Sequence, residues 1–97
     1  MYTISDTINT RSFQGLQVAK IMDLNAREII QVHLEADAIF PTHTSPTDAY
    51  ILVLEGEINF YINSDKFILK KHQFFDFPKK EEHWVEATKN SIFLIIR

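Results

Sequence analysis

Two histidines, His43 and His83, are the residues of this 97-residue chain best suited to chemistry. His43 stands at the head of a polar turn with a proline that leads into the apolar run 49–54, and His83 follows the charged run 79–82. An imidazole with its ordinary pKa of about 6.5 can exchange a proton near neutrality or bind a metal through its neutral nitrogen. We expect both side chains at strand ends, facing a cavity.

Other kinds of chemistry find little support in the chain. There is no cysteine, no Gly-x-Ser-x-Gly sequence and no glycine-rich phosphate loop, and nothing around Ser45 marks its hydroxyl as activated. His33 lies on a polar strand face and His72 at the start of a later strand, so we expect neither to take part in a site. No catalytic residue is assigned, and the sequence does not decide whether the protein is an enzyme.

Short strands must position the two histidines, because apolar residues alternate with polar ones over most of the chain. Gly56, between two such runs, predicts a tight hairpin of Glu55, Gly56 and Glu57, and Pro41 is expected to end the strand before it. No helical pattern is convincing. The pattern predicts an all-β protein of about nine short strands, a sandwich or barrel. The expected strands cover residues 17–22, 27–35, 39–40, 49–54, 58–62, 66–69, 73–77, 83–87 and 91–96.

The run 49–54 is apolar at every position, which is typical of a strand covered on both faces. Ala49, Ile51 and Val53 share one face, and Tyr50, Leu52 and Leu54 share the other. Such a strand needs a second sheet or a partner subunit over its outer face. We therefore expect a homodimer.

The stretch 43–57 resembles the first sequence motif of the cupin superfamily. With Gly56 aligned on the glycine that closes that motif, His43 falls on its first histidine, Ser45 on its second histidine and Ala49 on its glutamate. In the second motif, Pro78 falls on the proline and His83 on the histidine, whereas His72, Gln73 and Lys80 replace the usual Gly-Asp and turn glycine. The resemblance covers residues 28–96 and implies a jelly-roll barrel.

Cupins of this pattern hold one metal ion through three histidines and a glutamate, so the resemblance implies a degenerate metal site here. His43 and His83 are the remaining metal candidates, and two neutral ligands without a carboxylate would hold a divalent ion only weakly. Asp48 lies one residue from the glutamate position, where strand alternation turns it away. The plainer interpretation is two imidazoles hydrogen-bonded to each other, to water or to the backbone.

The composition of the chain indicates which classes of partner it is suited to bind. Forty-five per cent of the residues are hydrophobic, the formal net charge is −3, and the ten basic residues are scattered, so a nucleic-acid partner is disfavoured. With no leader segment and no long apolar run, we expect a cytoplasmic protein without membrane contact. Residues 1–97 are interpreted as a single domain in which residues 1–15 form an N-terminal arm.

Three functions follow from these observations. The first is a small-molecule-binding cupin that has no tightly held metal and takes a largely apolar ligand with one polar group. The second is a metal-dependent isomerase or dioxygenase with a two-histidine site, and the third is a dimeric interaction module with a vestigial cavity. The expected cavity residues are His43, Ser45, Ala49, Ile51, Phe77 and His83.

Overall fold

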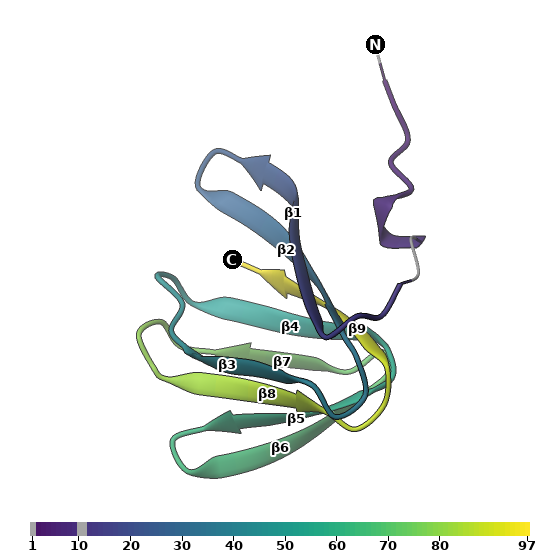
Figure 1. Ribbon diagram of the computed structural model, residues 1–97. Helices are drawn as coiled ribbons and strands as arrows, with labels where there is room; N and C mark the ends of the chain where they lie inside the picture. Colours follow the sequence, from purple (N-terminus) through teal and green to yellow (C-terminus); the bar gives the residue numbers. More distant parts are fainter. Residues whose placement is uncertain (1, 10–11) are drawn as a thin grey trace.

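The computed structural model describes residues 2–9 and 12–97, which form nine β-strands and one short 3₁₀ helix, η1 (Thr7–Asn9) (Figure 1). None of the described helices is long and apolar enough to cross a membrane. The strands are β1 (Leu16–Leu24), β2 (Arg27–Leu34), β3 (Ile39–His43), β4 (Ala49–Glu55), β5 (Glu57–Ile62), β6 (Asp65–Lys70), β7 (Phe74–Phe77), β8 (His83–Ala87) and β9 (Ser91–Ile96).

The strands form two antiparallel sheets (Figure 1). The five-stranded sheet has the order β1-β2-β9-β4-β7, and the four-stranded sheet has the order β3-β8-β5-β6. The expectation of an all-β protein of about nine short strands is therefore confirmed. Most neighbours within a sheet are distant in the sequence, as β2 and β9 are, so the fold depends on long-range pairing.

The hydrophobic core lies between the two sheets and takes residues from both. The alternation seen in the sequence supplies it, because every second side chain of a strand points to the same face. Burying one such side chain stabilises the fold by about 1.5–3 kcal/mol. The most deeply buried apolar side chains are Val32 and Leu34 of β2, Ile51 and Val53 of β4, Ile58 and Phe60 of β5, Val85 of β8 and Phe93 of β9.

Strand β4 is buried on one face and only partly covered on the other. Ala49, Ile51 and Val53 are buried in the core, but Tyr50 on the opposite face is 49% exposed. The Tyr50 ring makes an edge-to-face contact with the ring of Phe74, which is 61% exposed on β7. The described residues thus supply only part of the cover expected over the outer face of residues 49–54.

Gly56 does not close a hairpin, so that prediction was wrong. Strand β4 belongs to the five-stranded sheet and β5 to the four-stranded sheet, so the chain crosses between the sheets at this residue. The crossing brings Gly56, with φ +85°, against the start of β9, where an added Cβ would lie 2.8 Å from Ser91 Cα and closer still to Ser91 Oγ. Glycine is required here by both backbone conformation and space.

Pro41 does not end its strand either, contrary to expectation. Strand β3 continues through Pro41 to His43, and its register with β8 shifts between Phe40 and His43. Because β3 is an edge strand and Pro41 lies in the interrupted part of the ladder, no hydrogen-bond donor is missed. The extra length of β3 is what places His43 opposite β8.

The N-terminal arm lies partly outside the described residues, which leave out residues 1, 10 and 11 of the predicted stretch 1–15. Of the described part, Ser12 and Phe13 pack on β2: the Ser12 carbonyl lies 2.9 Å from His33 Nδ1, and the Phe13 and His33 ring centroids are 5.6 Å apart. Figure 1 shows the first described residues projecting away from the two sheets.

Candidate functional site

The side chains of His43 and His83 meet at the ends of β3 and β8. The two residues are direct partners in the β3–β8 ladder, which places their imidazoles side by side. Their Nε2 atoms are 3.0 Å apart, and the ring centroids are 4.2 Å apart in an edge-to-face arrangement. His83 is 2% exposed, whereas His43 is only partly buried. The pair therefore has one inner and one outer member.

The other ring nitrogen of each histidine faces a backbone carbonyl. His43 Nδ1 lies 2.7 Å from the Pro41 oxygen, and His83 Nδ1 lies 3.0 Å from the Glu81 oxygen. A carbonyl only accepts, so each Nδ1 must carry the proton, and each neutral ring then has a lone pair on Nε2. The two Nε2 atoms are therefore both acceptors in the neutral pair, and they face each other without a proton between them.

The surroundings of His83 oppose a charge on the pair. Burial lowers the pKa of His83 below its usual 6.5, and nearby His43 and Arg97 act in the same direction, whereas the hydrogen bond to the Glu81 carbonyl opposes them. Three phenylalanine rings contribute to this apolar setting. Phe40 stacks on His43 at 4.3 Å between centroids, and Phe60 and Phe77 lie 5.3 and 4.6 Å from the His83 ring.

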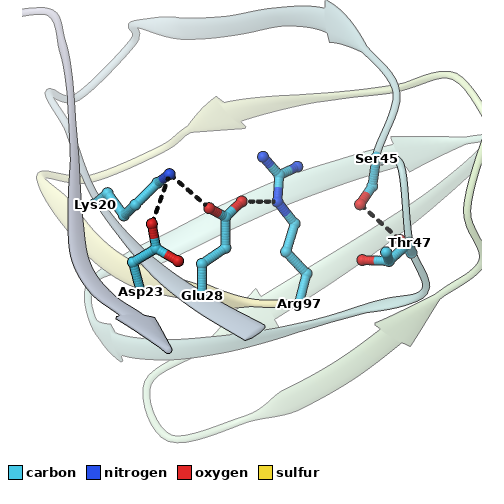
Figure 2. Close-up of polar contacts among 6 residues, drawn as sticks. All are labelled: Lys20, Asp23, Glu28, Ser45, Thr47 and Arg97. Carbon is cyan, nitrogen blue, oxygen red and sulfur yellow. Dashed lines mark hydrogen bonds and ion pairs between the residues drawn. The ribbon is translucent and has the colours of Figure 1, made fainter. Parts of the chain in front are cut away.

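The other expected cavity residues lie nearby or in the core. Ala49 and Phe77 are paired across β4 and β7, and both are buried, as is Ile51. Ser45 is also buried, and its hydroxyl donates a 2.6 Å hydrogen bond to the Thr47 carbonyl (Figure 2). That bond holds the turn between β3 and β4 in shape.

A comparison of the sequence with protein families identifies the domain. Residues 30–96 match the model of the cupin domain. The chain belongs to the cupin family. No curated protein matches this cupin.

Solved structures share the fold of this cupin across nearly its whole length. An RmlC-like cupin from Desulfovibrio desulfuricans is 17% identical, with a TM-score of 0.86 over 99% of this chain and 95% of that one. A conserved protein of unknown function from Streptococcus pyogenes is 16% identical, with a TM-score of 0.84 over 99% and 86%. A cupin-2 domain protein from Shewanella frigidimarina is 24% identical, with a TM-score of 0.74 over 87% and 81%. At these identities the likeness concerns the fold alone.

The residues of this cupin do not fit a tightly held metal. Among residues 2–9 and 12–97, no three histidine, cysteine, aspartate or glutamate side chains gather in a way that could hold an ion. His43 and His83 offer two neutral nitrogens, Ala49 has no donor atom, and the Ser45 hydroxyl is a weak ligand already bonded to Thr47.

Sequence reasoning missed the groups that orient the pair in this cupin. The Pro41 and Glu81 carbonyls each lie two residues before the histidine they bind, a spacing that could have suggested the contact. The contact of Phe60 with His83 had no local signal, because it depends on the β5–β8 register. Of the other histidines, His33 is buried and hydrogen-bonded to Ser12 and Gln31, and His72 lies in the turn between β6 and β7.

Proposed function

We propose that this cupin binds a small molecule through the His43–His83 pair and does so without a tightly held metal. The observation that carries the proposal is the pair of facing Nε2 atoms, 3.0 Å apart, in rings whose Nδ1 atoms are both committed to carbonyls. Two facing acceptors, of which the His83 nitrogen belongs to a buried residue, are unfavourable without a donor between them, and a ligand that supplies the donor removes that cost.

The geometry favours a ligand with a single hydroxyl or N–H group on a largely apolar body. A donor atom about 2.9 Å from each Nε2 would form a nearly equilateral triangle with the two nitrogens, which suits one shared hydrogen. The rings of Phe40, Phe60 and Phe77 around the pair suit an apolar remainder. A charged group is disfavoured by the same apolar surroundings.

The position of His43 supports a route by which a ligand reaches the histidine pair. It is the more exposed member of the pair and lies on the edge strand β3, next to the shift in the β3–β8 register. A residue beside an interrupted ladder is held by fewer backbone hydrogen bonds than one in a central strand, so it can move at lower cost. We infer that the ligand approaches from the side of β3.

A titration with phenol tests the binding, with anisole as the control probe that keeps the ring but lacks the donor. We expect phenol to shift the ¹⁵N resonances of His43 and His83 in a saturable way and anisole to leave them unchanged. Loss of the second acceptor in His43→Ala should weaken the binding of phenol by about tenfold. Equal binding of anisole, or unchanged affinity in the variant, would refute the role of the pair.

Elemental analysis of protein purified without chelator tests the absence of a tightly held metal. We expect substoichiometric Mn, Fe, Ni and Zn in both the native protein and His43→Ala. Stoichiometric metal that is lost in His43→Ala would overturn the proposal and would favour a metal-dependent enzyme with a two-histidine site.

The alternative function is a dimeric interaction module with a vestigial cavity. It is favoured by the Phe60 and Phe77 rings, which occupy the space next to His83. In that case Tyr50 and Phe74 on the outer face would serve dimerisation while the interior binds nothing. We propose a homodimer under either function. Absence of any saturable phenol effect together with a stable dimer would favour the interaction module.

A further inference from the structure

A second polar cluster lies on the other side of the five-stranded sheet, away from the core. The β1–β2 register places Gln17 opposite His33 and Ala19 opposite Gln31, so these four residues share the outer face of the sheet. Although this face points away from the core, Gln31 is 4% exposed and His33 is 6% exposed. Ser12 and Phe13 of the N-terminal arm contact His33 from outside.

The hydrogen bonds of this cluster fix the direction of the Gln31 amide and engage the amide nitrogen of Gln17. His33 Nδ1 donates to the Ser12 carbonyl at 2.9 Å, so the neutral ring accepts at Nε2, and the Gln31 amide nitrogen is its donor. The Gln17 amide nitrogen donates to Ser12 Oγ at 3.3 Å. Both amide nitrogens are thus engaged with protein groups, and the two Oε1 atoms need hydrogen-bond donors from elsewhere.

Neither Oε1 atom has a hydrogen-bond partner within the described part of the chain. Gln17 Oε1 and Gln31 Oε1 are buried, and no hydrogen-bond donor among residues 2–9 and 12–97 reaches them. A buried acceptor left unpaired costs about 1–3 kcal/mol, and native proteins contain few such atoms. Two of them in neighbouring strands point to a group that supplies donors.

Both glutamines also line a pocket between the arm and the sheet. Its volume is about 330 Å³, enough for a small organic molecule. None of the described residues that line it carries a formal charge when His33 is neutral, so a charged ligand would find no counter-charge among them. Among the described residues, those that line the pocket are Thr7, Ser12, Gln17, Val18, Ala19, Gln31 and His33.

We propose that this pocket is a second binding site, separate from the histidine pair, for a small neutral molecule that donates two N–H hydrogen bonds, as a primary amide does. The two N–H groups satisfy the oxygens of Gln17 and Gln31, and the side chains of the arm cover the ligand. The site does not depend on the function proposed for His43 and His83, which belong to the other sheet.

Nuclear magnetic resonance with acetamide tests the site in the full-length chain. Acetamide has two N–H donors, and N,N-dimethylacetamide is the matched probe without them. We expect acetamide in the millimolar range to shift the side-chain amide signals of Gln17 and Gln31 and the backbone amide of Ser12, with saturation. The dimethyl compound should produce no saturable shift. Equal effects of the two probes, or no saturable shift with acetamide, would overturn the proposal.

Two variants test whether acetamide binds at the two glutamines. Gln17→Met, at a partly exposed position, and Gln31→Met, at a buried one, each remove one acceptor and should weaken acetamide binding by about tenfold. His43→Ala should leave acetamide binding unchanged. If Gln31→Met does not fold, Gln17→Met decides alone. Unchanged affinity in Gln17→Met would refute the site, as would amide signals that respond to protein concentration and not to acetamide, because a second copy would then fill the pocket.

Discussion

His43 and His83 point their Nε2 atoms at each other across 3.0 Å, and the Nδ1 of each ring faces a carbonyl two residues earlier in the chain. Three contacts of this kind require three protons, whereas two neutral imidazoles carry two. The pair is therefore complete only when it takes up a proton or receives a donor from another molecule. Burial of His83 makes the added proton costly near neutrality, which leaves the donor.

The stability of the protein should depend on pH through His83. Burial, the main cause, lowers the pKa of folded His83 below its usual 6.5, so below about pH 6.5 the unfolded chain binds more protons than the folded one. The free energy of unfolding should therefore fall as the pH drops from about 6.5 to the folded pKa and should change no further through this group. Urea unfolding at a series of pH values measures this, and His83→Gln should lose the decline.

His72→Asn is the matched control for the pH series. It removes a histidine from an exposed turn, where φ is +68° and asparagine is well tolerated. The decline below about pH 6.5 should persist in this variant. If His72→Asn lost the decline, or if His83→Gln kept it in full, His83 would not be its source.

Replacement of Gly56 by alanine should destabilise the protein far more than replacement of Gly15. Both glycines have a positive φ, +85° and +62°, so each alanine pays a backbone cost of about 1–2 kcal/mol. Only Gly56 lacks space, because its Cβ would overlap Ser91 and the Asn90 carbonyl, whereas nothing lies within 4 Å of a Cβ at Gly15. Thermal unfolding of Gly56→Ala and Gly15→Ala compares the two, and equal losses would contradict the crowding at the sheet crossing.

The ion pair of Glu28 with Arg97 should produce a pH-dependent difference in stability. Arg97 Nε lies 2.7 Å from Glu28 Oε1, and Lys20 Nζ lies 3.0 Å from Oε2 (Figure 2). The hydrogen bond from Arg97, followed by that from Lys20, lowers the pKa of Glu28 below its usual 4.5. This stabilisation is present above about pH 4.5 and is lost as the pH falls through the lowered pKa.

Glu28→Gln should thus be less stable than the native protein at neutral pH, and the gap should close in acid. Chemical unfolding at several pH values measures the gap. Glu82→Gln, an exposed position before β8, controls for the loss of one negative charge. A gap for Glu28→Gln that stays constant from neutral to acid pH would argue against the ion pair.

The outer face of β4 and β7 should mediate the expected homodimer. Tyr50 and Phe74 are 49% and 61% exposed there, and we expect sedimentation at micromolar concentration to detect a dimer. Phe74→Glu should convert it to a monomer, because a charge would be buried in an apolar interface. Ile68→Glu, at a 53% exposed position on β6 of the other sheet, should remain dimeric. A native protein that sediments only as a monomer would exclude the homodimer.

Local pattern predicted the strands well and their connections less well. The alternation of apolar residues located all nine strands. Gly56 was predicted to close a hairpin because a glycine between two strands favours a tight turn. The sequence around it does not encode that β4 pairs with β7 and β9 while β5 pairs with β6 and β8.

The sequence by itself determined the all-β class, the approximate strand positions and the resemblance to cupins, since these follow from local periodicity and short motifs. Only the tertiary structure decided that His43 and His83, 40 residues apart, are cross-strand neighbours, and that Gln17 and Gln31 share the outer face of one sheet. The physical reason is that strand periodicity fixes the face on which a side chain lies but leaves the pairing partner open. The partner is set by long-range register, which only the assembled sheets define.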